Sequence, residues 1–145
     1  MSFDIHSYHF VHGQDEKYEG NELVQIRELF FQMAETVQEA EGEWFDLCMP
    51  DKGSTNISGT TFFIYNMSPQ LAALVYRVAI IGYLTLIPTW KHGPLIFSEA
   101  QRDDLPDGDF FAQAIICHDE HEAILLFCEG FEGFSRYRDF VLGKK

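Results

Sequence analysis

Apolar residues recur along the chain with two different periods, and the changes between them predict the order of strands and helices. Residues 3–11 are rich in aromatic side chains and alternate imperfectly, which favours a first strand. After a polar loop over residues 13–20, apolar side chains step by three and four positions, as on one face of a helix: Leu23, Ile26, Phe30, Met33 and Val37. Asn21 is the expected N-cap of this helix and Gly42 its expected stop.

A second helix is indicated by its capping residues. Ser68 and Pro69 suit the N-cap and first position of a helix with Gly82 just beyond its end. Strands before and after this helix are predicted over residues 44–49, 60–67 and 83–87. Further on, Ser98 and Gln101 have the spacing of a capping box and indicate a single helical turn.

The C-terminal third is predicted to contain a hairpin and a last helix. Residues 110–117 and 122–128 are apolar runs, which we interpret as two strands around a turn at Asp119-Glu120. The last helix is expected from about residue 132 to residue 142. This order of elements predicts an α+β fold, a ferredoxin-like or split βαβ α/β sandwich with a C-terminal β-hairpin and helix. The length of 145 residues predicts a single globular domain, residues 1–145.

Several predicted strands are apolar on both faces, most clearly over residues 62–65, 114–116 and 124–127. In a two-layer sandwich one face of the sheet meets water, and its strands alternate apolar and polar side chains. We therefore expect the last helix to cover the second face. The alternative is a partner on that face, either a second copy of the chain in a homodimer or another protein.

Acidic residues outnumber basic ones by 23 to 10, which gives a formal net charge of −13. Disordered acidic chains lack the apolar residues that build a core, whereas this chain is 46% hydrophobic and contains 14 Phe. The sequence therefore predicts a folded acidic domain. Its charge attracts basic partners and repels nucleic acid and anionic membranes, so we expect neither of the latter as a partner.

Two segments, residues 28–46 and 103–132, contain many acids and neither Lys nor Arg. On the first predicted helix the acids lie away from the apolar stripe, and the second segment begins in a predicted surface loop. We predict that these side chains form a partner-binding surface, here called the acidic face: Glu28, Glu35, Glu39, Asp103, Asp104, Asp107 and Asp109. The alternative is a solvated surface that only keeps the protein soluble.

The densest group of metal-ligating residue types is the run Cys-His-Asp-Glu-His-Glu over residues 117–122. In the predicted hairpin, His118 and His121 lie opposite each other, with Cβ atoms about 4.5–5.5 Å apart. Together with Cys117 they are the candidate ligands of a zinc-like ion. An ordinary solvated turn is the alternative, because the run has neither zinc-finger nor HExxH spacing.

Other candidate chemistry is sparse. His6, His9 and His12 are spaced by three, which places successive side chains on opposite faces of a strand, so we expect them to fill space rather than to share a metal. The aromatic side chains that are candidates either for a ligand cavity or for packing are Trp44, Trp90 and Tyr83. The chain has no GxSxG context and no glycine-rich phosphate loop, so no catalytic residue and no cofactor is predicted.

The expected compartment is the cytoplasm. Cys48, Cys117 and Cys128 are odd in number and lack a CxxC pair, which is typical of a reducing environment. The first residues have neither the basic nor the apolar region of a signal peptide. The apolar stretch over residues 71–87 contains Arg77 and falls short of the roughly 20 apolar residues that a bilayer requires, so no membrane span is predicted.

These features together favour a non-enzymatic, acidic cytoplasmic protein that binds a basic protein partner, as an immunity or inhibitor protein would. One alternative is a small-ligand or metal-binding enzyme that uses His118 and His121. A second alternative is a structural homodimer with no separate activity.

Overall fold

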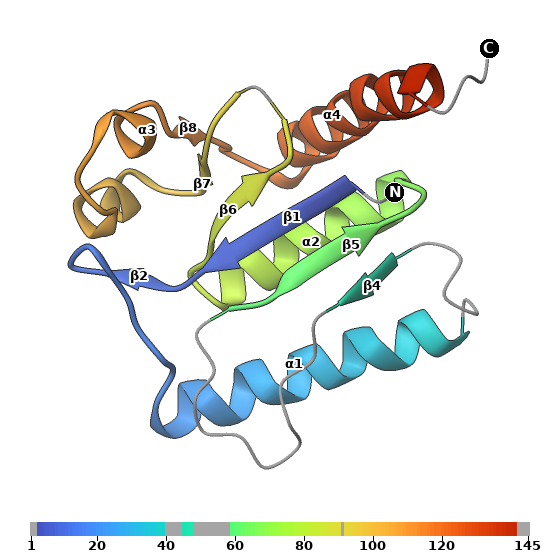
Figure 1. The fold of residues 1–145 in the computed structure, drawn as a ribbon. Helices are drawn as coiled ribbons and strands as arrows, with labels where there is room; N and C mark the ends of the chain where they lie inside the picture. The colour runs from blue at the N-terminus through green and yellow to red at the C-terminus, as the bar shows by residue number, and fades with distance from the viewer. Residues whose placement is uncertain (1–2, 40–44, 48–58, 91, 142–145) are drawn as a thin grey trace.

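The computed structural model describes residues 3–39, 45–47, 59–90 and 92–141 of the chain. In this part of the chain a six-stranded sheet has the strand order β4-β5-β1-β6-β7-β8 (Figure 1). The elements that build the sheet and its helices are β1 (Phe3–Tyr8), α1 (Gly20–Glu39), β4 (Phe45–Leu47), β5 (Thr61–Ile64), α2 (Pro69–Ile81), β6 (Thr85–Pro88), β7 (Leu95–Ile96), β8 (Ile115–Ile116) and α4 (Glu120–Val141). A small second sheet consists of β2 (Phe10–Val11) and β3 (Gln14–Asp15), and two short helices are η1 (Glu99–Asp104) and α3 (Asp109–Ala112).

The first six elements of the large sheet and its helices form two interlocked βαβ units. Strand β5 pairs antiparallel with both β1 and β4, so β1 and β4 are parallel strands split by β5. Strand β1 likewise pairs antiparallel with β5 and β6 and splits the second unit. The predicted α+β sandwich with split βαβ connections is therefore confirmed.

The two central strands bury one face and leave the other partly exposed. On β1, Phe3 and Ile5 are fully buried, and on β5, Phe62 and Ile64 are fully buried, while their neighbours in each strand are half-buried. This alternation is typical of an antiparallel sheet with one covered face. The buried face packs against α2, whose apolar side contributes to the same core, as does Ile26 of α1.

Helix α2 begins as its sequence predicts. The Ser68 hydroxyl oxygen accepts a hydrogen bond from the Leu71 amide at 3.1 Å, and Pro69 occupies the first position, where a missing N–H costs nothing. Helix α1, by contrast, begins at Gly20, so the predicted N-cap Asn21 lies inside the helix. The predicted stop at Gly42 lies outside the described residues.

The predicted C-terminal hairpin is wrong. Residues 122–128 belong to α4, a helix of 22 residues, while residues 110–117 divide into α3 and the two-residue strand β8. Ala123 and Phe127 are fully buried and Leu125 is 56% exposed, which is a helical rather than a strand period. The supposed turn is the helix start, because the Asp119 carboxylate accepts the Glu122 amide at 2.8 Å as an N-cap. A short apolar run does not by itself distinguish a buried strand from a helix.

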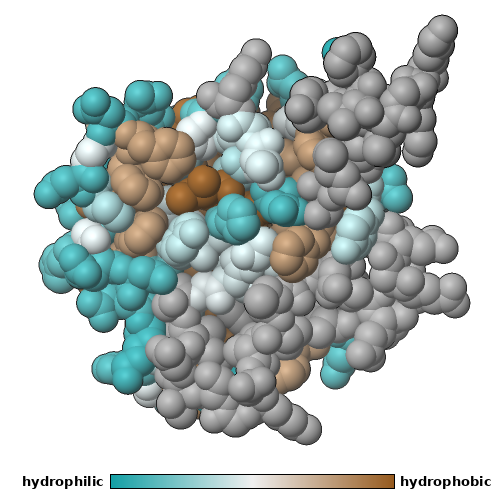
Figure 2. Space-filling view, viewed as in Figure 1, coloured by the Kyte–Doolittle hydropathy of each residue, from teal (hydrophilic) through white to brown (hydrophobic). Residues whose placement is uncertain are grey.

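Helix α4 extends the helical layer instead of covering the second face of the sheet. It packs along α2, and the Phe3 ring contacts Phe131 and Phe134 of α4 at centroid distances of 6.1 and 5.6 Å. The prediction that the last helix covers the second face is therefore wrong. Figure 2 shows apolar and polar side chains mixed on the visible face of the molecule. A homodimer through the sheet stays a prediction.

Within the described ranges, none of the helices combines the length and the apolar content that crossing a bilayer requires.

Two glycines in α4 provide a matched test of its packing. A Cβ at Gly130 would lie 2.7 Å from a ring carbon of Trp90, whereas a Cβ at Gly133 would meet nothing within 4 Å. We expect Gly133→Ala to stabilise the fold by about 0.5–1 kcal/mol through helix propensity. Gly130→Ala should be net destabilising, because overpacking costs about 1–3 kcal/mol. Urea unfolding measures both, and equal shifts would contradict the packing of α4 against Trp90.

Candidate functional site

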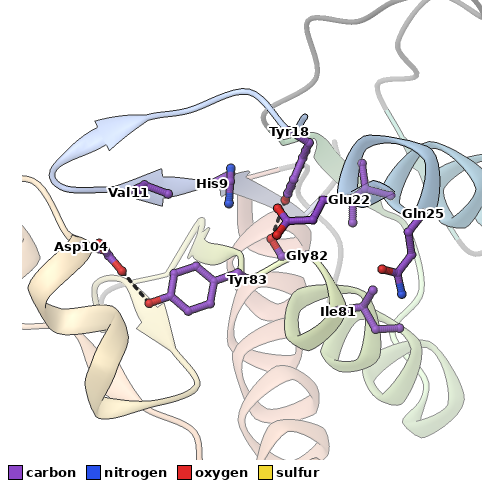
Figure 3. A pocket seen from close by; sticks show the side chains of 10 residues that line it. His9, Val11, Tyr18, Glu22, Gln25, Ile81, Gly82, Tyr83 and Asp104 are labelled. Atoms are coloured by element: carbon purple, nitrogen blue, oxygen red, sulfur yellow. Dashed lines mark hydrogen bonds between the residues drawn. The ribbon is translucent and has the colours of Figure 1, made fainter. Parts of the chain in front are cut away.

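A cavity of about 460 Å³ lies where the start of α1, the end of α2, the β2–β3 hairpin and η1 meet. Its polar lining comes from different elements, which Figure 3 shows converging on one space. These residues are His9, Tyr18, Glu22, Gln25, Tyr83 and Asp104. Val11, Ile26 and Ile81 form apolar parts of the wall.

The β2–β3 hairpin brings His9 and Val11 to the cavity. His12 and Gly13 form its two-residue turn with φ angles of 51° and 79°, and both positive values are required by a type I′ turn. Asp104 fixes this turn, because its carboxylate accepts the His12 amide at 3.0 Å and its carbonyl oxygen accepts the Gly13 amide at 2.9 Å. The hairpin is thereby tied to the end of η1.

His9 is a buried, oriented imidazole. The residue is 8% exposed, and its ring stacks on Tyr18 with centroids 4.1 Å apart and an interplanar angle of 20°. Its Nδ1 lies 2.6 Å from the carbonyl oxygen of Glu16. Because a carbonyl oxygen only accepts, Nδ1 carries the proton in this bond. Within the described chain, no hydrogen bond of Nε2 is seen, and the residue lines the cavity.

Of the three N-terminal histidines, His6 lies apart, with its Nδ1 3.1 Å from the Thr61 hydroxyl on the neighbouring strand. His9 and His12 both line a second hollow beside the cavity, and the His12 side chain is 91% exposed. His9 is the one of the three that lines the cavity itself, with its ring stacked on Tyr18. The expectation that the three histidines fill space rather than share a metal stays a prediction.

The end of α2 positions Tyr83. The Tyr83 amide donates to the Ile80 carbonyl at 3.3 Å and the Leu84 amide to the Ala79 carbonyl at 2.9 Å, the paired bonds of a Schellman motif. The left-handed residue of this motif is usually glycine. Here it is Tyr83 itself, with φ of 52°, and Gly82 before it has φ of −86°. A tyrosine in this conformation is uncommon and directs attention to its function.

Gly82 is required by close packing rather than by its φ angle. A Cβ at this position would lie 2.8 Å from Ile26 Cδ1 and 3.0 Å from the Tyr18 hydroxyl. The start of α1 therefore approaches the end of α2 so closely that a larger residue in place of Gly82 would require Ile26 or Tyr18 to shift. At this close contact the Tyr18 hydroxyl donates a hydrogen bond to the Gly82 carbonyl oxygen at 2.5 Å.

The hydroxyl proton of Tyr83 is also engaged, since it is donated to the Asp104 carboxylate at 2.6 Å. Burial and this hydrogen bond raise the pKa of Tyr83 to about 12. Burial, assisted by the negative charges of Glu22 and Asp15, raises the pKa of Tyr18. The hydrogen bonds from the His12 amide and from Tyr83 lower the pKa of Asp104. At neutral pH both tyrosines are therefore neutral donors and Asp104 is a carboxylate.

The lining side chains define what the cavity offers to a ligand. No Ser, Thr, Cys or Lys lines it among the described residues, so the usual side-chain nucleophiles are missing from its wall. Both tyrosine hydroxyls are committed to protein acceptors. What remains for a ligand is a set of hydrogen-bond acceptors, two aromatic rings and an apolar surface.

The predicted acidic face divides into two groups on either side of this cavity. Glu28 and Glu35 are exposed on α1, and Asp103, Asp107 and Asp109 are exposed at η1 and α3. In Figure 1 these elements lie on different sides of the β2–β3 hairpin. Asp104 is not a free surface acid, because it bonds His12 and Tyr83. The side chain of Glu39 lies outside the described residues.

The residues of the predicted metal site do not face one another across a hairpin. His118 and His121 stand at the start of α4, both exposed, and His118 bonds the Glu122 carboxylate at 3.1 Å. Cys117 is buried, its thiol lies 3.3 Å from the Asp119 carbonyl, and burial with the nearby Glu122 charge raises its pKa to about 11. Across the described ranges, no three His, Cys, Asp or Glu side chains gather as a metal site would require. The geometric reason for expecting a metal at this turn is thus removed.

Of the three aromatic candidates, Tyr83 lines the cavity. Trp90 serves packing, since it stacks near Phe127 and donates to the Gly93 carbonyl at 2.7 Å, and Trp44 lies outside the described residues. Sequence reasoning missed Tyr18 and Glu22. The His12-Gly13 pair is the one local signal that would have indicated the hairpin beside them.

Asp104→Asn tests the carboxylate at the centre of this network. Because the pKa of Asp104 is lower in the folded state, its stabilisation is present above the ordinary aspartate pKa of about 3.9 and is lost as the pH falls below that value. We expect the variant to be less stable at pH 7, with a difference that shrinks on acidification through this range. Thermal unfolding against pH measures this effect.

The matched control for this experiment is Asp103→Asn, the exposed neighbouring acid. It should leave the stability profile close to that of the parent. If both variants gave the same profile, the role assigned to Asp104 would be wrong.

Comparisons of the chain with protein-family models, with curated proteins and with solved structures give no match. The function is therefore argued from the site itself.

Proposed function

We propose that this protein is a non-enzymatic, acidic cytoplasmic binding protein whose partner is a basic protein, in the manner of an immunity or inhibitor protein. The observation that supports it most is the unpaired negative charge on α1 and around η1 and α3. Within the described part of the chain, five exposed acids of the acidic face make no ion pair with a basic side chain: Glu28, Glu35, Asp103, Asp107 and Asp109. Such charge remains available to a partner.

The start of α1 adds acid to this surface. A second hollow, of about 530 Å³, shares His9, Val11 and Glu22 with the cavity, and Glu16 and Glu19 also line it. Lys17 is its one basic side chain besides histidine. Negative potential is concentrated where concave surfaces and unpaired acids coincide, which favours the arrival of a cationic partner.

Charge complementarity of this kind raises the rate of association and excludes unsuitable partners more than it adds affinity. An inhibitor of a basic enzyme benefits from both effects, because it must reach its target quickly and ignore the acidic majority of proteins. Nucleic acid and anionic membranes are repelled by the same potential.

The proposal predicts salt-dependent binding of a basic protein. Immobilised protein should capture basic proteins at about 50 mM salt, and the captured protein is then purified for titration calorimetry. We expect its Kd to rise on the order of tenfold or more between about 50 and 500 mM salt, because the Debye length shortens severalfold. A Kd that is indifferent to salt would contradict the proposal.

Charge-reversal pairs locate the surface. Glu28→Lys with Glu35→Lys alters α1, and Asp103→Lys with Asp107→Lys alters η1 and the following loop. The control is Glu129→Lys with Glu132→Lys on α4, which changes the net charge equally outside the acidic face. We expect slower association for one or both test pairs and a smaller effect for the control. Equal effects of all three pairs would mean that net charge, not the acidic face, directs binding.

A further inference from the structure

We propose that the cavity between α1, α2 and the β2–β3 hairpin binds an organic cation, the ammonium or guanidinium group of an amine. The proposal rests on the proposed function for its natural source, a Lys or Arg side chain of the basic partner. A free small amine has the same chemistry and is treated below as the other source.

The hydrogen bonds of the lining residues leave the cavity with acceptors and very few donors. Tyr18 donates to the Gly82 carbonyl, Tyr83 donates to Asp104, and the His9 Nδ1 proton is held by the Glu16 carbonyl. What these groups still offer is the Nε2 lone pair of His9 and the oxygen lone pairs of the tyrosines. The Glu22 carboxylate adds negative charge. Only the Gln25 amide among the lining side chains keeps a donor for a ligand.

His9 contributes a hydrogen-bond acceptor in addition to the acidic charge of the cavity. The residue is buried to more than nine-tenths and lines the cavity, and its Nε2 has no partner in the described chain. Nε2 is not among the buried polar atoms that lack a partner, so it reaches accessible space where water or a ligand can meet it. A donor on the ligand would satisfy it, and a cationic N–H gives the stronger, charge-assisted bond.

The end of α2 adds a second negative feature. Ile81 and Gly82 line the cavity, and the last turn of α2 contains no basic residue. A helix C-terminus carries a partial negative charge that favours a cation nearby. In this structure the chain itself supplies no such cation in the last turn, so the position is open to one from a ligand.

The walls fit the remaining parts of an amine side chain. The half-buried ring of Tyr83 lines the cavity, and aromatic rings attract cations within about 6 Å, whereas the ring of Tyr18 is buried and stacked on His9. The apolar surface of Val11, Ile26 and Ile81 suits the methylene groups that carry the charged end of Lys or Arg. The cavity of about 460 Å³ lies within the size range of small-ligand sites.

The experiment titrates the full chain with N-acetyl-arginine amide and, in parallel, with the neutral isostere N-acetyl-citrulline amide, followed by ¹H–¹⁵N NMR. We expect arginine amide to shift the backbone signals of residues around the cavity, with His9, Gly82 and Tyr83 among them. Citrulline amide should bind on the order of tenfold more weakly, because it lacks the charge. Equal binding of the two probes, or shifts outside the cavity only, would overturn the proposal.

Two variants test the residues that carry the argument. Glu22→Gln removes one lining charge at nearly constant volume, and Glu28→Gln makes the same change on the outer side of α1. We expect about threefold to tenfold weaker binding of arginine amide to the first variant and no change for the second. An equal loss in both would show a general charge effect and overturn the assigned site.

Tyr83→Asn separates recognition from folding. Asparagine tolerates the left-handed conformation of this position, so the variant should remain folded while it loses the ring face. Reduced binding by a variant with parent-like circular dichroism supports the proposal. Undiminished binding by that variant would overturn the role of the ring.

A third probe, free spermidine, distinguishes the two sources. If arginine amide and the captured partner compete for the cavity and spermidine binds more weakly, the source is a partner side chain. If spermidine binds more tightly and no basic partner is found, the proposed function fails and the cation site stands. If the partner binds with salt dependence but arginine amide does not bind, the cation site is overturned and the proposed function stands.

Discussion

The structure depends most on the close approach of α1 to the end of α2. Tyr18 and Ile26 lie so near to Gly82 that a Cβ there would require one of them to shift, and the Tyr18 hydroxyl bonds the Gly82 carbonyl. The left-handed residue that reverses the chain is the next one, Tyr83. This contact and this reversal together end the helix, lead the chain into β6 beside the central strand β1, and place a tyrosine at the cavity.

Asp104 connects this end of α2 to the rest of the site. The carboxylate receives the Tyr83 hydroxyl and the His12 amide, so it joins η1 to both α2 and the hairpin. It belongs to the acidic segment of the sequence, but it acts as an internal acceptor while its neighbour Asp103 is exposed. The amino-acid composition gives the net charge, but it does not show which acidic side chains accept hydrogen bonds inside the fold.

The parts of the fold that the sequence predicts are those with a local cause. Ser68 and Pro69 begin α2 because capping needs only neighbouring residues. The strand order of the split βαβ units follows from the alternation of elements. The predicted last helix agrees with the second half of α4, whereas the first half, residues 120–131, falls mostly in the predicted hairpin. Asp119 is an N-cap in the structure and is equally typical of a turn, since both roles use the same short polar side chain.

The cavity could not be predicted because no local pattern defines it. Its lining residues are far apart in the sequence, the first being His9 and the last Asp104, and tertiary contacts bring them together. Tyr83 was a candidate for a cavity on residue type alone. Its left-handed conformation belongs to the chain reversal after α2, where the sequence offers a tyrosine instead of the usual glycine.

The acidic face and the cavity act over different distances and therefore on different steps of binding. Exposed charges act over about 8–10 Å at physiological salt, so in the proposed function they would guide a basic partner toward the protein but would not select one residue of it. In the proposed site the cavity would select, because a group without a cationic N–H does not give His9 Nε2 and Glu22 the charge-assisted bond that a cation gives. Loss of surface charge should chiefly slow association, whereas loss of a cavity contact should chiefly speed dissociation. If the charge served only solubility, the surface variants would not slow association and the cavity variants would not speed dissociation.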